Sequence, residues 1–297
     1  MIDRKQHVME KAHELFREKG YQATSIQDIL DFSGISKGTF YNYFPSKSEL
    51  FKAVFHHIQL KYEEIRNQLL IGEDLADVEI FIKQLDLIMQ SNQRNKMFAL
   101  IDEVLASNDP DLRQFIKLMH VKSIRWIYRR FIDLFGSDKE PYLLDCAILF
   151  SGMLQQTIQY NFMAKASDLN HLDVIRYCVA RIQSVVLDVA QSGKQLLDPD
   201  ILNTWLPDSP NTKNKIFHDV FEATSEMKKQ VEKLLNEPVR LKYLQLLDFI
   251  QEEMFNQRSP RSYLIESALL SLQMCNELKN SSYLANYEEI ITKYAPH

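Results

Sequence analysis

The sequence has few of the residues that interrupt helices. Of its 297 residues, 7 are glycine and 9 are proline, and no proline lies between Pro45 and Pro110. Average proteins contain about 7 % glycine and about 5 % proline, and both residues mark turns and breaks. Long stretches without them, in which apolar residues recur at helical spacing, predict an all-α fold, and no segment has the alternating pattern of a strand.

Other absences exclude whole classes of protein. Cys146, Cys178 and Cys275 are widely spaced without a C-x-x-C pair, which argues against a disulfide framework and a zinc motif. No apolar run approaches the ~18 residues that cross a bilayer, and residues 1–20 are too charged for a signal peptide. We therefore expect a protein of the reducing cytoplasm that needs no membrane, metal or other cofactor.

Motifs of catalysis are missing as well. The chain has no H-E-x-x-H, no G-x-S-x-G and no glycine-rich phosphate loop. Its 8 histidines are scattered along the sequence. We therefore predict that the protein is not an enzyme.

Charge is distributed unevenly along the chain. The formal net charge is −5, but residues 1–60 have 8 Lys or Arg against 7 Asp or Glu, whereas the remainder has 27 against 33. Within residues 36–52, Lys37, Lys47 and Lys52 outnumber the one acidic residue, Glu49. The amino-terminal segment therefore offers the best electrostatic match to a polyanion.

Turn residues near the amino terminus separate short helices. Helical spacing of apolar residues runs over about 3–19 and ends at Gly20, which we interpret as a helix C-cap. Thr24 and Gln27 have the spacing of a capping box that starts a second helix. A longer helix is expected over about 47–70.

Residues 24–44 have the layout of a helix-turn-helix. Gly34 allows the tight turn, and Ser36 is the predicted N-cap of the second helix of the pair. In this layout that second helix enters the major groove of DNA, with its amino-terminal residues toward the bases. Phe40 and Phe44 can pack inward while the opposite face contacts DNA.

Residues 12–55 resemble the DNA-binding domain of TetR-family transcriptional repressors. That family has the pattern A-x-x-L-F-x-x-x-G-Y-x-x-T-S/T, followed by G-x-S-x-G-x-x-Y-x-x-F-x-x-K-x-x-L. The matching residues here are Ala12, Leu15, Phe16, Gly20, Tyr21, Thr24, Ser25, Gly34, Ser36, Gly38, Tyr41, Phe44, Lys47 and Leu50. Many members have histidine where this chain has Tyr43, but a phenol can still donate to phosphate.

The resemblance implies a homodimer whose two recognition helices enter successive major grooves of a palindromic operator in double-stranded DNA. The residues that it places on phosphates are Thr24, Ser36, Tyr43 and Lys47. The residues that it places nearest the bases are Lys37, Gly38, Thr39, Tyr41 and Asn42. By side-chain chemistry, Asn42 could pair with adenine and Lys37 with guanine.

The chain beyond the head divides into three predicted parts. By the resemblance, residues 1–50 form the DNA-binding head, and residues 72–192 form a helical ligand-binding and dimerisation domain. Three prolines between Asp198 and Asn211 predict a linker over 193–211. Residues 212–297 are an additional helical region, because repressors of this family commonly end near the position of Ser192.

Two apolar stripes predict packing surfaces. The stripe from Leu172 to Val189 is expected to pair with its symmetry mate in the dimer, although it could equally be ordinary core. The stripe from Ile216 to Leu234 needs a partner surface, which we expect within the same dimer.

A small-molecule effector is expected in the middle domain. Large, adaptable side chains suited to a pocket occur there, although each of them could instead be a packing residue. The candidates are Met97, Phe98, Met119, Trp126, Phe131, Tyr160 and Met163. We interpret Arg125, Arg129 and Arg130 as a solvated face, so the expected effector is apolar or aromatic.

These observations together predict a DNA-binding transcriptional regulator. It is expected to be a repressor that a small apolar or aromatic ligand releases from its operator. The alternative is a helical interaction protein, or a regulator that acts through a protein partner docked on the carboxy-terminal region.

Overall fold

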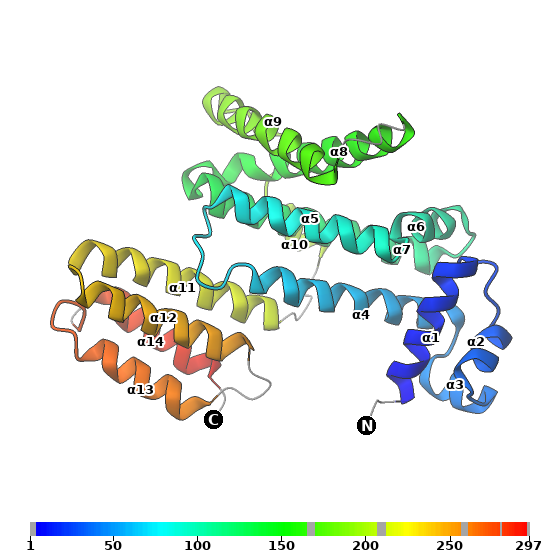
Figure 1. The fold of residues 1–297 in the computed structure, drawn as a ribbon. Coiled ribbons are helices and arrows are strands. Elements are labelled where there is room, and N and C mark those ends of the chain that lie inside the picture. Colours follow the sequence, from blue (N-terminus) through cyan, green and yellow to red (C-terminus); the bar gives the residue numbers. More distant parts are fainter. Residues whose placement is uncertain (1–3, 165–169, 207–211, 257–260, 280, 296–297) are drawn as a thin grey trace. The chain divides into compact units, whose positions relative to one another are not determined.

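The computed structural model describes residues 4–164, 170–206, 212–256, 261–279 and 281–295 (Figure 1). Over these residues the chain forms fourteen α-helices, one 3-10 helix and no strand. The predicted all-α fold is confirmed.

The chain divides into two compact units. The first contains Met1–Arg66 and Val78–Pro207, and the second contains Asn67–Asp77 and Asp208–His297. The segment Asn67–Asp77 therefore belongs with the carboxy-terminal helices, whereas the sequence divides it between the connecting helix and the middle domain. The backbone N–H of Gly72 donates to Gln251 Oε1 at 3.3 Å, and no local sequence pattern indicates a partner so far along the chain.

The first unit begins with the head and a long connecting helix. These elements are α1 (Arg4–Lys19), α2 (Ile26–Ser33), α3 (Lys37–Tyr43) and α4 (Lys47–Gln68), of which the last two residues lie in the second unit. The body follows with α5 (Val78–Arg94), α6 (Met97–Ala106), α7 (Pro110–Phe135), η1 (Ser137–Lys139), α8 (Glu140–Met163), α9 (His171–Ser192) and α10 (Ile201–Trp205). Helix α7 begins at Pro110 because the Asp109 side chain caps it and proline is tolerated in the first turn of a helix.

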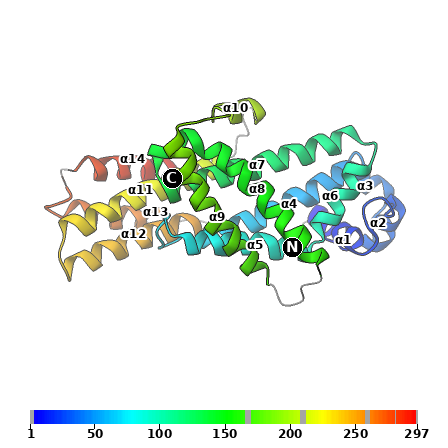
Figure 2. The ribbon, with the colours of Figure 1, turned by 90° about the horizontal axis from the view of Figure 1, so that it is seen from above.

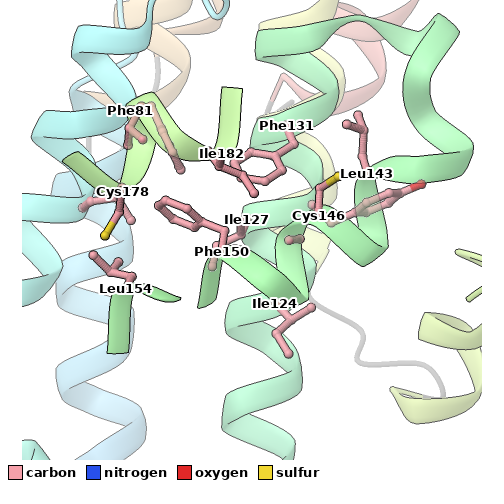
Figure 3. Close-up of a cluster of buried hydrophobic side chains, with 14 of the residues drawn as sticks. Phe81, Ile124, Ile127, Phe131, Leu143, Cys146, Phe150, Leu154, Cys178 and Ile182 are labelled. Carbon is pink, nitrogen blue, oxygen red and sulfur yellow. The ribbon is translucent and has the colours of Figure 1, made fainter. Parts of the chain in front are cut away.

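One core of the first unit lies among α5, α7, α8 and α9 (Figure 3). Phe81, Phe131 and Phe150 meet there, with ring centroids 5.5 to 5.8 Å apart. The α9 stripe residues Ile175 and Val179 are buried in this core. The expectation that this stripe forms the dimer surface is therefore wrong, because its apolar side chains are already buried in the core of their own subunit.

The predicted linker over 193–211 contains a short packed helix. Leu202 of α10 is buried in the same core, and Leu206 is buried as well. Prolines limit the length of a helix but do not prevent one short turn from packing, so part of this segment belongs to the body.

A second core of the first unit joins the head to the body. Buried residues of α1 to α4, such as Phe16 and Phe51, share it with Met97 and Leu100 of α6 and with Leu112 of α7. The head therefore does not pack only on itself, because one face of α6 and the amino-terminal half of α7 contribute to its core.

The second unit is a bundle of α11 (Thr212–Leu234), α12 (Val239–Asn256), α13 (Ser262–Gln273) and α14 (Ser282–Tyr294). The α11 stripe supplies Val220, Met227 and Val231 to the core of this bundle, and all three are buried. The partner surface of this stripe is thus its own unit rather than a dimer face. Helix α13 ends at Gln273, and Cys275 and Leu278 are buried in the turns that follow it.

Candidate nucleic-acid interface

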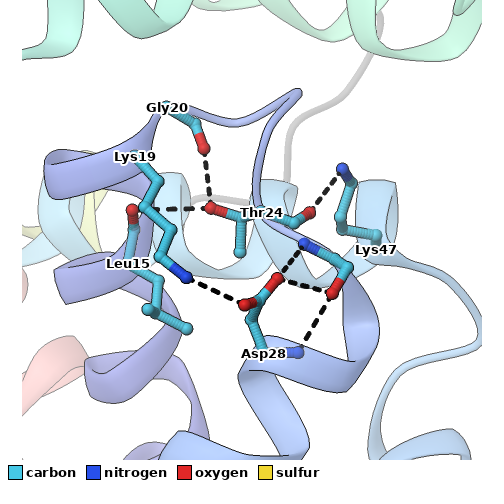
Figure 4. Close-up of polar contacts among 7 residues, drawn as sticks. Leu15, Lys19, Gly20, Thr24, Asp28 and Lys47 are labelled. Atoms are coloured by element: carbon cyan, nitrogen blue, oxygen red, sulfur yellow. Dashed lines mark hydrogen bonds and ion pairs between the residues drawn. The ribbon is translucent and has the colours of Figure 1, made fainter.

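The turn between α1 and α2 is held by the side chains of Thr24, at its end, and of Lys47, at the start of α4 (Figure 4). Gly20 has a left-handed φ of +87°, and the Thr24 hydroxyl donates to the Gly20 carbonyl oxygen at 2.7 Å. The ammonium of Lys47, at the start of α4, donates to the carbonyl oxygens of Tyr21 and Thr24, each at 2.8 Å. This turn is therefore fixed in position relative to the first turn of α4.

Burial changes the chemistry of two groups at this turn. Desolvation lowers the pKa of Lys47, and the carboxylate of Glu103 acts in the opposite direction. Desolvation, with a smaller contribution from Asp109, raises the pKa of Tyr21 to about 12. The Lys47 ammonium also lies 4.4 Å from the centre of the Tyr21 ring, an attractive cation–π arrangement.

Helix α2 begins at a capping box one residue later than predicted. The Ser25 N–H donates to Asp28 Oδ2 at 2.8 Å, and the Asp28 N–H donates to Ser25 Oγ at 3.1 Å. Thr24 cannot cap the helix, because its hydroxyl is bonded back to the end of α1. The ion pair with Lys19 and the bonds to Ser25 hold the pKa of Asp28 well below its usual range.

The turn into α3 follows the predicted chemistry. Gly34 has a left-handed φ of +68°, and its N–H donates to the Leu30 carbonyl oxygen at 2.9 Å. Ser36 caps α3 by accepting the Thr39 N–H on its Oγ at 3.2 Å. These two residues set the direction in which α3 leaves α2.

Helix α3 has one buried and one exposed face. Phe40 is buried and packs edge-to-face on Tyr41, with ring centroids 5.4 Å apart, and Phe44 is buried behind it. Lys37, Gly38 and Asn42 are exposed on the other side, and 43 % of Tyr41 is exposed. The helix therefore presents a cation, an amide and a phenol from a rigid support, which suits contact with base edges.

The nine predicted DNA contacts do not all lie on this face. Seven lie on α3 or border it, namely Ser36, Lys37, Gly38, Thr39, Tyr41, Asn42 and Tyr43. Thr24 is 0 % exposed, and its hydroxyl is used inside the fold. Lys47 is half-buried, and its ammonium already holds the carbonyl oxygens of the 21–24 turn.

Sequence reasoning did not identify a contact between the body and the head. Glu103 of α6 accepts the backbone N–H of Gln22 on its Oε2 at 3.1 Å, and the Gln22 side chain donates to the Glu103 carbonyl oxygen at 3.2 Å. The two residues are far apart in sequence, so no spacing rule connects them. The carboxylate of Glu103 makes α6 a neighbour of the same turn that Lys47 holds.

The seven predicted pocket residues are spread over different surroundings. Met97 and Met119 belong to the core shared with the head, whereas Phe131 and Trp126 belong to the other core. Phe98, Tyr160 and Met163 are exposed. The structure therefore does not bring these seven side chains together.

Two arginines lie beside the aromatic residues of the body. Arg130 is only 3 % exposed, and it donates to Gln84 Oε1 at 3.1 Å and to Asp133 at 2.6 Å. The interpretation of Arg130 as part of a solvated face is wrong, because helical periodicity does not show which helix covers a polar residue. Arg66 lies 4.2 Å from the centre of the Trp126 ring, and burial lowers the pKa of Arg66 to about 10.

The residues that the structure describes contain neither a cluster of metal-binding side chains nor a helix able to cross a membrane. Within it, His, Cys, Asp and Glu side chains nowhere gather in threes that could hold a metal ion. Among the same residues, none of the helices has the length and apolar character needed to cross a membrane.

Comparisons with known proteins agree with the geometry of the head. Residues 8–54 match the family model described as bacterial regulatory proteins of the tetR family. The matched segment contains α2 and α3 entire and most of α1. No solved structure gave a significant match to the chain.

Three curated relatives illustrate the range of similarity. The uncharacterized HTH-type transcriptional regulator YerO of Bacillus subtilis is 24 % identical over 284 residues, covering 93 % of this chain and 92 % of YerO. The uncharacterized HTH-type transcriptional regulator YuxN of the same organism is 28 % identical over 158 residues, or 52 % of this chain and 54 % of YuxN. The HTH-type transcriptional repressor DhaR of a Mycobacterium species is 44 % identical over 43 residues, or 14 % of this chain and 22 % of DhaR.

The similarity to YerO extends over most of both chains, so it includes much of the carboxy-terminal region as well as the head. Relatives that align over shorter stretches are also named as HTH-type regulators. The family match, these relatives and the exposed face of α3 agree with one another. The protein is a DNA-binding transcriptional regulator whose amino-terminal helix-turn-helix is similar to that of the tetR family of bacterial regulatory proteins.

Proposed function

We propose that this regulator is a repressor that binds a palindromic operator as a homodimer in the cytoplasm, where bacterial DNA is found. The exposed face of α3 is the observation that supports operator binding most directly. In this proposal, Lys37, Gly38, Thr39, Tyr41 and Asn42 lie nearest the bases. Ser36 and Tyr43 bind phosphates beside them. Lys47 binds a phosphate while its ammonium still donates to the carbonyl oxygens of the 21–24 turn.

The burial of Thr24 limits its part in this interface. Its hydroxyl donates to the Gly20 carbonyl oxygen, and the side chain is enclosed. We infer that Thr24 acts by holding the turn rather than by donating to a phosphate.

Helices α8 and α9 pack against each other (Figure 2), and their exposed residues support a homodimer. Leu149 and Tyr160 of α8 and Tyr177 and Leu187 of α9 are large, apolar and exposed. Between the large residues lie Gly152, Ala180 and Ser184, which are also exposed, and small residues let partner helices approach closely. This side of the two helices, rather than the buried α9 stripe, is the proposed dimer surface.

A matched pair of substitutions tests the dimer. Leu187 and Leu270 are exposed to a similar degree, but Leu270 lies on α13 in the other unit. Leu187→Glu is expected to give monomers in analytical ultracentrifugation, whereas Leu270→Glu remains dimeric like the unchanged protein. A Leu187→Glu protein that stays dimeric contradicts this surface.

Release from DNA is proposed to follow binding of a small apolar or aromatic effector in the body. Phe81, Trp126, Phe131 and Phe150 form an aromatic group between α5, α7 and α8, and Phe81 touches each of the other three rings. Helix α7 extends from this group to the core that it shares with the head. A ligand that shifts α7 or α6 would therefore shift the head spacing in the dimer.

Reciprocity gives a test of effector release. If the effector weakens operator binding by some factor, operator DNA must weaken effector binding by the same factor. Calorimetric titration of an effector into free protein and into the protein–operator complex measures both affinities. Equal affinities contradict release by ligand.

Base contact by α3 is tested by electrophoretic mobility shift with DNA from the protein's own promoter region. Asn42→Ala is expected to abolish discrimination between bases at one base pair, which corresponds to about 1–3 kcal/mol of binding free energy. Asn286→Ala, an exposed position on α14, is the control and should bind like the unchanged protein. Equal discrimination by both variants would remove Asn42 from the list of base contacts.

A second candidate function is regulation through a protein partner on the carboxy-terminal unit. The exposed residues Tyr263 and Leu270 of α13, and Met274 directly after it, favour this function because their spacing places them on one side of the helix. Leu270→Glu distinguishes the two functions, because it would break such a partnership and leave operator binding unchanged.

A further inference from the structure

A groove of about 500 Å³ lies between the beginning of α1 and the turn that precedes α3. The first turns of α1 supply Arg4 and His7, and the turn after α2 supplies Gly34 and Ile35. Ser36 and Thr39 form the side that belongs to α3. The groove is therefore built from α1 as well as from the helix-turn-helix itself.

The chemistry of the lining suits an anion. It offers a guanidinium, an imidazole and the hydroxyl groups of Ser36 and Thr39, and none of the lining residues is acidic. The Ser36 and Thr39 hydroxyls lie 2.9 Å apart in a mutual hydrogen bond, so they are held in place together. Arg4 is exposed, and it has no ion pair or hydrogen bond with the part of the chain that the structure describes.

The groove lies next to the exposed face of α3. Ser36 and Thr39 belong both to the groove and to the set of expected DNA contacts. The start of α1 also runs along the far end of α3, because the Lys5 ammonium is 5.4 Å from the centre of the Phe44 ring. An anion in this groove would therefore lie immediately beside DNA whose bases meet α3.

We propose that Arg4 and His7 bind a phosphodiester of the operator backbone in this groove. Arg4 contributes the charge and two donors, as guanidinium groups do with phosphate, and His7 contributes a ring N–H. Helix α1 is then part of the DNA interface as well as a support for it. This inference rests on the operator binding proposed above and extends it beyond the helix-turn-helix.

The test compares two substitutions that remove the same charge from the same helix. Arg4→Gln changes the groove, and Arg17→Gln changes an exposed residue in the last turn of α1. Operator affinity of the full-length proteins is measured by fluorescence anisotropy at several salt concentrations. We expect Arg4→Gln to weaken binding about tenfold and to flatten the salt slope by about 0.9 for each bound protomer, whereas Arg17→Gln keeps the slope.

Two control measurements make the result specific. Thermal unfolding of Arg4→Gln should match that of the unchanged protein, because Arg4 is exposed. The loss of affinity should be the same for the operator and for operators with single base pairs changed, as expected for a phosphate contact. His7→Gln should weaken binding in the same uniform way, by a smaller factor.

Three results would count against the proposal in different ways. An identical salt slope for Arg4→Gln and Arg17→Gln overturns the site. A loss that depends on one base pair overturns the phosphate assignment and indicates a contact to a base edge in the groove of the DNA. Failure of the unchanged protein to bind any DNA contradicts operator binding itself, and with it this site.

Discussion

Lys47 offers a sharp test of how the head is held together. Its ammonium donates to the carbonyl oxygens of Tyr21 and Thr24 at 2.8 Å, and Lys47→Met removes the charge while keeping most of the aliphatic stem. Hydrogen bonds from a charged group contribute about 1.5–3 kcal/mol each. Because Lys47 is only half-buried, water replaces part of the lost hydrogen bonding. We therefore expect Lys47→Met to lower the free energy of unfolding by about 2 kcal/mol in total.

This loss is large enough to measure. For a unit of this size, 1 kcal/mol corresponds to about 2–4 °C, so Lys47→Met should lower the melting temperature of the first unit by about 4–8 °C. Lys52→Met is the control, since Lys52 lies one turn further along α4 and pairs with Glu49 at the surface, where such pairs contribute about 0–1 kcal/mol. Differential scanning calorimetry of both variants gives the comparison.

The same two variants separate the structural role of Lys47 from a phosphate contact. If Lys47 also binds a phosphate, the salt slope of operator affinity flattens by about 1 in Lys47→Met. Equal melting temperatures for Lys47→Met and Lys52→Met would refute the role in the turn, and an unchanged slope would refute the phosphate contact.

Three further predictions concern single residues. Gly34→Ala should lower the free energy of unfolding by about 1–2 kcal/mol, which is the cost of a left-handed non-glycine residue. No steric cost is added, because a Cβ at this position would meet nothing within 4 Å. Chemical denaturation measures the loss, and a much larger value would mean a steric clash. The depressed pKa of Asp28 stabilises the fold above the unfolded-state pKa of about 3.9, and this contribution is lost as the pH falls through the lower folded value. Melting temperatures measured from about pH 5 down to about pH 2 should therefore fall less steeply for Asp28→Asn, and parallel curves would count against the pairing with Lys19 and Ser25. Gln251→Leu removes the acceptor of the Gly72 N–H, so amide hydrogen exchange at Gly72 should become faster. The control Gln273→Leu should leave this exchange rate unchanged. Equal exchange rates in both variants would show that this bond does not hold the 67–77 segment.

The head could be predicted closely because its signals are local. Gly34, Ser36 and the Phe40–Phe44 pair each determine a turn, a cap or a buried face within a few residues. The one local error, the capping box, arose because Thr24 and Ser25 are both good caps. The hydroxyl of Thr24 was taken by the end of α1, which spacing alone does not reveal.

The rest of the chain was less predictable because periodicity shows which face of a helix is apolar but not what covers it. The apolar stripes of α9 and α11 are both buried, each in the core of its own unit. The placement of Asn67–Asp77 with the carboxy-terminal helices, like the bond from Gln22 to Glu103, depends on residues far apart in sequence. The predicted pocket residues do not lie together in the structure. Their type could not show this, because large apolar side chains fill cores as readily as they line cavities.

In the proposed function, the exposed face of α3 recognises a specific DNA sequence. The most direct measurement is selection of binding sites by the full-length protein from a library of random double-stranded DNA, followed by titration at fixed salt. If α3 recognises a specific sequence, one palindromic sequence should be enriched and should bind at least about 10³-fold more tightly than unselected DNA. In Asn42→Ala, that preference should be lost at one base pair. Equal binding of all sequences, or no binding at all, would contradict it.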